Sequence, residues 1–422
     1  MKAKIVVTGI SAITPLGSNV DSIVTNLKEG NSGIKRIERY HVGSLPVKHA
    51  AMIDESVLNE VQYPVAGNLI FKLFYSCVKD LFETCDLSKI YNPERIGLIV
   101  GTDPNTSSAE DLQYLYSHVK NEETPASAPF ETEKLLTNNP SFMFYHVARA
   151  FGIEGPGIAN FGTCAASAQA IGDAMLMLRS GDIDAAITGG VSSKLDPMSL
   201  ARLCRLGALE PTKINHKENC SPFDLHRNGF TIAEGSVLFV LETEENALRR
   251  NAHIYAEIQG YGSSMDGYSI TDPHETSLGM TLSMQRAIED AEVSLESIDY
   301  INAHGTGTQK NDKHETEAIK HVFGALSTHV DISSTKSMHG HLMTAAGAME
   351  ALVTIFSIRN GFVPPTINFQ TPDPNCDLQY NPNHSKAKDI NVAITNSFGM
   401  GGQNASLVIS KYKRGVTNGE SF

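Results

Sequence analysis

The sequence predicts an α/β fold made of two similar halves, and three observations support this prediction. Short β-branched runs, several ending in glycine, alternate with segments whose apolar residues repeat at helical spacing. The 422 residues exceed the about 250–300 that one simple core usually holds. Each half passes through a strand–helix unit that carries a reactive residue, and each closes with a hydrophobic strand.

The predicted strands are largely apolar on both faces, as in a sheet that helices cover on both sides. They span residues 5–9, 96–101, 185–190, 236–241, 298–302, 391–395 and 406–410. Helices are expected over 165–180, 278–292, 311–324 and 343–360. This alternation predicts a mostly parallel sheet. We place the boundary between the halves near residue 250, which gives 1–250 and 251–412, with a polar tail over 413–422.

Composition and charge exclude several classes of protein. Hydrophobic residues make up 41% of the chain and charged residues 19%, which is typical of a protein with a large packed core. The net charge of −13 argues against nucleic acid or an anionic membrane as the main partner. No run approaches the ~20 apolar residues that a membrane helix needs.

The cysteines are scattered and form no CxxC pair; they stand at positions 77, 85, 164, 204, 220 and 376. This spacing fits neither a zinc site nor a disulfide framework. It predicts a reduced, cytoplasmic protein. We expect no metal and no cofactor.

Cys164 stands at a predicted strand-to-helix turn, in Asn160-Phe-Gly-Thr-Cys-Ala-Ala-Ser. The positive end of the following helix is expected to lower the thiol pKa, and its N–H groups can hold the oxyanion of an attacked thioester. A buried core cysteine is the ordinary interpretation of such a residue. The turn and two glycine-flanked histidine loops favour a nucleophile instead.

Those loops are Asn302-Ala-His-Gly-Thr-Gly-Thr308 and Lys336-Ser-Met-His-Gly-His341. Both follow strands, at the sheet ends where α/β sites gather. One thiol with the imidazoles of His304 and His341 indicates an enzyme that handles acyl groups on sulfur. Lys336 is placed to keep the local charge positive and to pair with Glu350. His314 and His339 are interpreted as structural or surface residues.

The chain resembles the β-ketoacyl-acyl-carrier-protein synthases of the thiolase superfamily over about residues 1–412. The resemblance rests on motifs in chain order: Val7–Gly17, the Cys164 turn, Ser221–Phe230 with Glu234-Gly235, Asn302–Thr308, Ser334–His341, Val363–Asn368 and Asn396–Gly402. It implies a duplicated five-layer αβαβα fold and a dimer. It also implies that acyl and malonyl groups arrive on the phosphopantetheine of an acyl carrier protein.

The resemblance assigns roles to single residues. Cys164 would take the acyl chain, and His304 and His341 would donate hydrogen bonds to the malonyl thioester oxygen as CO₂ leaves. Lys336 and Glu350 would orient the histidine loops. The gating loop would comprise Phe398, Gly399, Met400 and Gly401, with the N–H groups of Cys164 and Met400 as the oxyanion hole. The loop departs from elongating synthases, which usually carry phenylalanine at Met400 and threonine at Gln403.

Residues 309–320 look most like the catalytic α ketosynthase of bacterial type II polyketide systems, which pairs with a chain-length-factor subunit. This favours a polyketide ketosynthase in a heterodimer, or otherwise a homodimer. One alternative is a β-ketoacyl-acyl-carrier-protein synthase II of fatty-acid elongation. Another is a non-catalytic, chain-length-factor-like subunit. The retention of Cys164, His304, His341 and Lys336 in the chain argues against this alternative.

Two further alternatives fit the residues less well. A thiolase would need a second cysteine near the C-terminus, and only Cys376 is available, in a stretch without glycines. A cysteine amidase or peptidase would leave His341 unexplained.

Carrier proteins are acidic, so we expect a basic docking patch formed by Arg202, Arg205 and Lys72.

Overall fold

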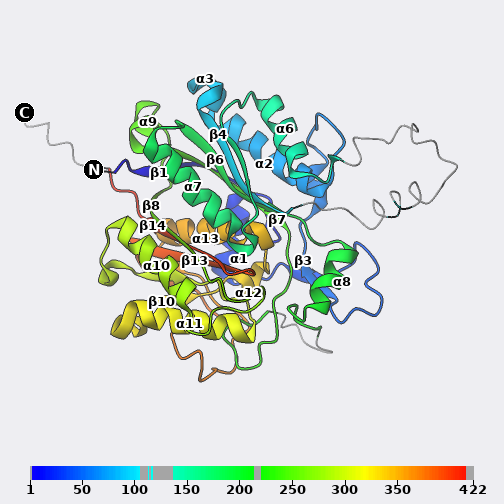
Figure 1. The fold of residues 1–422 in the computed structure, drawn as a ribbon, viewed down its shortest axis with the longest axis vertical. Helices are drawn as coiled ribbons and strands as arrows, with labels where there is room; N and C mark the ends of the chain where they lie inside the picture. Colours follow the sequence, from blue (N-terminus) through cyan, green and yellow to red (C-terminus); the bar gives the residue numbers. More distant parts are fainter. Residues whose placement is uncertain (1, 105–112, 114–115, 117–135, 213–219, 415–422) are drawn as a thin grey trace, which may run out of the picture.

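The computed structural model describes residues 2–104, 113, 116, 136–212 and 220–414 (Figure 1). Most of the predicted tail, from residue 415 on, lies outside this part. The strands of the first half are β1 (Ile5–Ile13), β4 (Ile96–Thr102), β5 (Gly157–Asn160), β6 (Ala185–Ser192) and β7 (Gly235–Thr243). Those of the second half are β8 (Ala256–Met265), β9 (Tyr300–Asn302), β10 (Asp331–Ser333), β13 (Val392–Gly399) and β14 (Gln403–Ser410).

These strands form one ten-stranded sheet in the order β10-β9-β13-β14-β8-β1-β7-β6-β4-β5. If strands are counted along the chain within each half, both halves run third, second, fourth, fifth, first from the outer edge inward. The first strands join the halves, where Ile5 pairs with Ile258 and Val7 with Ala256. The predicted duplication is confirmed, while the boundary near residue 250 stays a prediction.

The sheet is mixed, so the prediction of a mostly parallel sheet is wrong. β4 runs parallel to β5 and β6, and β9 runs parallel to β10 and β13. Every pair that involves β1, β7, β8 or β14 is antiparallel. β13 and β14 are joined by residues 400–402 alone, and a turn that short connects only antiparallel strands. The apolar runs reflect burial on both faces and carry no information about strand direction.

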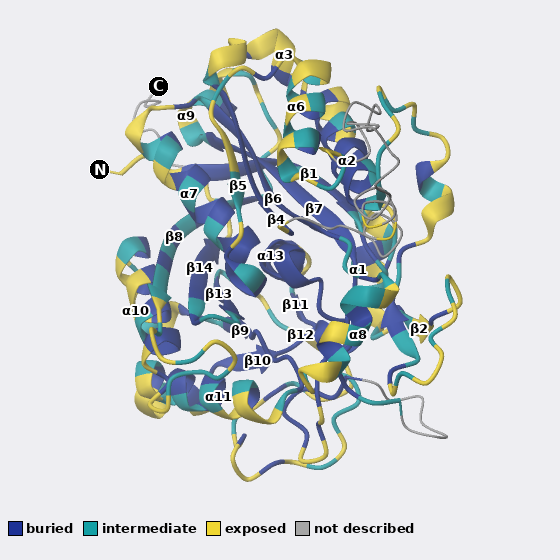
Figure 2. Ribbon diagram, turned by 45° about the vertical axis from the view of Figure 1, so that its right-hand side comes forward, coloured by how far each residue is buried: buried dark blue, intermediate teal, exposed yellow. Residues whose placement is uncertain are grey.

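Helices separate and cover the two halves of the sheet. α7 (Ala166–Ser180) and α13 (Ala346–Asn360) pack together between the halves, and residues 346–358 of α13 are all buried (Figure 2). α2 (Leu69–Cys85) and α6 (Pro140–Phe151) cover the outer face of the first half. α10 (Leu278–Ala291) and α11 (Gln309–Phe323) cover that of the second. The order of layers is αβαβα.

The four predicted helices are confirmed as α7, α10, α11 and α13. α2 and β8 were not predicted. β8 alternates buried and half-buried residues and lacks a continuous apolar run. None of the described helices is long and apolar enough to cross a membrane.

Candidate active site

Cys164 is the middle residue of the 3₁₀ turn Thr163–Ala165, which leads from β5 into α7. Thr163 has φ +51°, in the left-handed region that β-branched residues rarely adopt. Such a conformation costs about 1–3 kcal/mol and persists only where the surroundings enforce it. The second half has the same feature, a non-glycine residue with positive φ at the start of a 3₁₀ turn: Met343 has φ +50° and begins the turn before α13. The sharp turn places Cys164 on a cavity wall.

The His341 ring is fixed by the backbone at the start of the same second-half turn. Its Nε2 lies 3.1 Å from the sulfur of Cys164, and its Nδ1 accepts the N–H of Met343 at 3.1 Å. Because Nδ1 accepts, the proton of the neutral ring is on Nε2. Burial, and secondarily the charge of Lys336, hold the pKa of His341 well below its usual range. The ring is therefore a neutral N–H donor that faces the sulfur.

The His304 ring is also neutral with its proton on Nε2, but a different neighbour fixes the proton there. Lys336 Nζ lies 3.1 Å from its Nδ1, and an ammonium group can only donate. The remaining nitrogen, Nε2, therefore carries the ring proton. Burial and then Lys336 also hold the pKa of His304 well below its usual range. The centroids of the two imidazoles are 5.3 Å apart, and both rings line the cavity with Cys164.

Lys336 and Glu350 form an ion pair, and both side chains are buried. Lys336 Nζ also donates to the carbonyl of His304 at 2.5 Å. Glu350 accepts a hydrogen bond from the Ser397 hydroxyl at 3.2 Å. The pair thus connects the His304 loop, α13 and β13, which come from distant parts of the sequence.

The expected lowering of the Cys164 pKa is wrong. Burial raises the pKa of this thiol to about 11, although Lys336 and the backbone N–H groups of Met400 and Cys164 favour the thiolate. Desolvation outweighs these groups because the side chain is almost fully enclosed, at 5% exposure. The resting group is a thiol.

We therefore expect alkylation of Cys164 by iodoacetamide to keep accelerating, by about tenfold per pH unit, up to pH 10, since only the thiolate reacts. A thiol with an ordinary pKa would level off near pH 9. Mass spectrometry of the peptide that contains Cys164 measures the rate, with Cys164→Ala as the blank. A plateau below pH 9 would contradict the raised pKa.

The cavity has a volume of about 420 Å³, and Phe398, Gly399, Met400 and Gly401 line it together with the three reactive residues. Phe398 is buried, with its ring centroid 6.0 Å from that of His304. Gly399 approaches the nucleophile turn so closely that an added Cβ would lie 2.2 Å from Thr163 Oγ1. The predicted gating segment therefore lies directly against Cys164.

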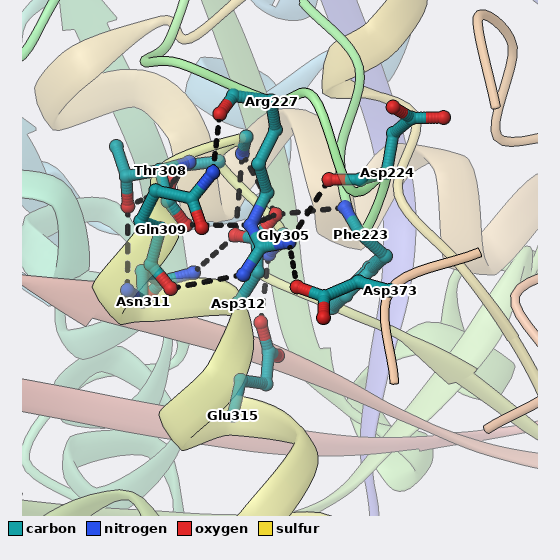
Figure 3. A network of polar contacts seen from close by, with 12 residues as sticks. Phe223, Asp224, Arg227, Gly305, Thr308, Gln309, Asn311, Asp312, Glu315 and Asp373 are labelled. Carbon is teal, nitrogen blue, oxygen red and sulfur yellow. Dashed lines mark hydrogen bonds and ion pairs between the residues drawn. The ribbon is translucent and has the colours of Figure 1, made fainter. Parts of the chain in front are cut away.

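Two buried carboxylates that sequence reasoning missed hold the His304 loop from α11 (Figure 3). Glu315 accepts the N–H groups of His304 and Gly305 at 2.8 and 2.7 Å, and burial raises its pKa to about 7. Asp312 accepts the N–H of Gly307 at 3.1 Å and pairs with Arg227 at 3.6 Å. Acidic residues three positions apart, on the face of a helix that also carries apolar residues, were the available signal.

Asp103 was also missed, and it supports the His341 side of the site. It is 1% exposed and directly follows β4, the strand that corresponds in the first half to β9, which His304 follows by two residues. Its carboxylate accepts the hydroxyls of Thr344 and Ser192, both at 2.9 Å. Thr344 lies three residues after His341, so the first half helps to hold the histidine loop of the second.

The remaining predicted residues lie farther from the reactive cluster. Arg202 and Arg205 are exposed on the last turn of α8 (Pro197–Arg205), directly before residues 206–208, which line the cavity. Lys72 is half-buried on α2, with Nζ 6.0 Å from the ring centroid of Tyr63, and is not a lining residue. Cys376, the second cysteine that a thiolase would need, is buried outside the cavity.

The reactive cluster is poorly suited to a metal ion. One sulfur and two ring nitrogens lie within 4.8 Å of one another, a spacing that an ion could bridge. A metal binds only an unprotonated nitrogen. Because Met343 and Lys336 donate to the Nδ1 atoms, the Nε2 atoms of both histidines carry protons. The arrangement favours hydrogen bonding to an oxygen atom.

A thiol beside two neutral N–H donors is an arrangement suited to carrying acyl groups on sulfur and to stabilising charge on a carbonyl oxygen. The family model "Beta-ketoacyl synthase, N-terminal domain" matches residues 2–67 and 68–247, and "Beta-ketoacyl synthase, C-terminal domain" matches 255–370. The chain belongs to this β-ketoacyl synthase family of the thiolase superfamily. It is a ketosynthase-type acyltransferase.

Relatives of full length are similar to this chain. The 3-oxoacyl-[acyl-carrier-protein] synthase 2 of Synechocystis sp. is 34% identical over 98% of this chain and 99% of its own length. The enzyme of the same name from Coxiella burnetii is 33% identical over 97% and 99%.

Solved structures share the fold. One is a type II polyketide ketosynthase in complex with its acyl carrier protein and bound to the hexaketide (TM-score 0.87, 30% identity, 98% of this chain and 100% of that chain). Another is the ishigamide ketosynthase/chain length factor (TM-score 0.87, 29% identity, 98% and 100%).

Proposed function

We propose that this chain elongates acyl chains on acyl carrier protein with malonyl units, in the manner of fatty-acid elongating synthases. The observation that carries the chemistry is the pair of neutral N–H donors, His304 and His341, beside Cys164. The sequence alone favoured a polyketide pathway. The relatives named 3-oxoacyl-[acyl-carrier-protein] synthase 2, at 33–34% identity, support the fatty-acid alternative better.

In the first step, Cys164 Sγ attacks the carbonyl carbon of the acyl-carrier-protein thioester. A new C–S bond forms, and negative charge develops on the carbonyl oxygen, where the N–H groups of Cys164 and Met400 would receive it. The bond to the carrier sulfur then breaks. The proton lost by Cys164 ends on the carrier thiol, so the step consumes no net proton.

In the second step, the malonyl carboxylate leaves as CO₂, and the electron pair of the broken C–C bond forms an enolate. The Nε2–H groups of His304 and His341 would stabilise the enolate oxygen, because donors aimed at developing charge lower the barrier. The enolate carbon attacks the acyl carbonyl on Cys164. A C–C bond forms, the C–S bond breaks, and the sulfur takes up a proton.

Lys336 and Glu350 would act through His304 and not on the substrate. Lys336 donates to His304 Nδ1, which keeps the ring proton on Nε2, and Glu350 balances the buried ammonium charge. This division of roles agrees with the pKa of His304, which is held well below its usual range. The neutral ring already presents Nε2–H as a hydrogen-bond donor, so it does not need a second proton.

Cys164→Ala provides the direct test. Intact-mass analysis should show acylation of the wild-type chain by octanoyl-carrier protein and no adduct on the variant. The wild-type chain with malonyl-carrier protein should then release a β-ketoacyl product. An adduct on the variant would mean that another residue is the nucleophile. Absence of condensation by the wild-type chain would restore the non-catalytic, chain-length-factor-like interpretation.

The polyketide pathway is the second candidate. It is supported by the two ketosynthase structures at TM-score 0.87 and by residues 309–320. In the described part of the chain, β5 is an edge strand paired only with β4; Ile158 on this strand is 38% exposed, and Phe161 directly after it is 49% exposed. We propose that this edge pairs with a related chain. Condensation only with a co-purified, cysteine-less partner would establish the heterodimer.

Carrier-protein docking is proposed at Arg202 and Arg205, which are exposed beside the cavity and form no ion pair with any described residue. Arg202→Glu with Arg205→Glu should raise the KM for acyl-carrier protein by about tenfold or more, since like charges repel an acidic partner. The reaction with octanoyl-pantetheine should be unchanged. Steady-state kinetics with both substrates measures the difference. An unchanged KM for the carrier protein would remove these residues from the docking surface.

A further inference from the structure

The turn that closes the cavity is tied to the residue before the nucleophile. Thr163 Oγ1 donates to the carbonyl of Met400 at 2.9 Å. Met400 is the first residue of the turn between β13 and β14; it lines the cavity together with Cys164, and its backbone N–H favours the thiolate form of Cys164. The residue that accepts the Thr163 hydroxyl therefore also carries a backbone N–H on the side of the cavity that holds Cys164.

A second tie holds the other end of this turn. Gln169 Nε2, on the first turn of α7, donates to Oε1 of Gln403, the first residue of β14, at 3.1 Å. The space around Gln169 is filled, because a Cβ on Gly162 would lie 2.0 Å from its Oε1. The turn at residues 400–402 is thus fastened on both sides to the segment that carries Cys164.

The conformation of Thr163 is unfavourable for its residue type. A threonine with φ +51° needs enforcement by its surroundings, and such a residue at an active site suggests a functional role. The hydroxyl fits a narrow space against Gly399. A glycine would relieve the backbone but would leave the Met400 carbonyl without this donor.

We propose that Thr163 is a positioning residue: its hydroxyl, helped by the Gln169–Gln403 pair, holds the Met400 N–H at the oxyanion of acyl transfer. The inference rests on the proposed function, which makes Cys164 the nucleophile and the Met400 N–H an oxyanion donor. Malonyl decarboxylation depends on the two histidines and not on this turn. The hydrogen bond from Thr163 to Met400 therefore supports acyl transfer and does not affect decarboxylation.

Thr163→Val removes the hydroxyl and keeps the β-branched shape. It should slow acylation of Cys164 by octanoyl-carrier protein about fivefold to tenfold, the effect of one lost hydrogen bond. Primer-free decarboxylation of malonyl-carrier protein should stay within twofold of the wild-type rate. Thr163→Ser should restore acylation. Thr188→Val is the matched control, since this buried threonine on β6 has no hydrogen-bond partner among the described residues.

Gln403→Leu, alone and combined with Thr163→Val, tests whether the two ties hold the same turn. Non-additive effects on acylation are expected, because both residues restrain one short segment. Three results would each overturn the inference. Thr163→Val could lose acylation and decarboxylation equally, it could lose no acylation, or Thr163→Ser could fail to restore acylation. A wild-type chain that is not acylated would instead refute the proposed function.

Discussion

Alanine at His304 or His341 leaves Cys164 able to accept an acyl group, while malonyl decarboxylation falls by about 10²–10³-fold, as for loss of one oxyanion donor. The expectation follows from the ring states: each imidazole is neutral, and each presents Nε2–H to the cavity. Condensation fails in both variants because no enolate forms. Product analysis after a single acylation by octanoyl-carrier protein separates the two steps.

His321→Ala is a suitable control, since this histidine is exposed on α11 and does not line the cavity. His341 also touches the sulfur, so a modest slowing of acylation is expected for His341→Ala and not for His304→Ala. Normal condensation by either variant would refute the assigned roles. Loss of acylation in His304→Ala would show that this residue serves the first step.

Lys336→Met should destabilise the fold by about 3–5 kcal/mol, because it leaves the buried carboxylate of Glu350 without its counter-ion. It should also abolish condensation, since His304 Nδ1 loses the donor that keeps the ring proton on Nε2. Urea unfolding measures the first effect and the malonyl assay measures the second. Lys313→Met is the control, because Lys313 pairs with Glu317 on the exposed surface of α11.

The double variant Lys336→Met with Glu350→Gln separates the structural and the chemical roles. Removing both charges should restore most of the lost stability, since no unpaired charge stays buried. Condensation should stay low, because His304 still lacks its donor. Recovery of condensation in the double variant would mean that Lys336 acts only by balancing the charge of Glu350.

Local pattern was sufficient for the predicted helices and for selecting three residues, Cys164, His304 and His341, that the fold brings to one cavity. α7 and α13 each follow a three-residue 3₁₀ turn; Cys164 lies in the first of these turns, and His341 comes two residues before the second. β8 escaped prediction because one of its faces is only half-buried. Asp312 and Glu315 escaped because an acidic residue on a helix is ordinarily interpreted as solvent-exposed.

The sequence by itself indicated the candidate reactive residues and that each stands at the end of an element, because burial periodicity and turn composition are local properties. The tertiary structure decided the strand directions and the chemical state of each reactive group. The proton positions on His304 and His341 depend on Lys336 and Met343, and the raised pKa of Cys164 depends on enclosure by both halves. Tautomer and desolvation are set by groups that only folding brings together.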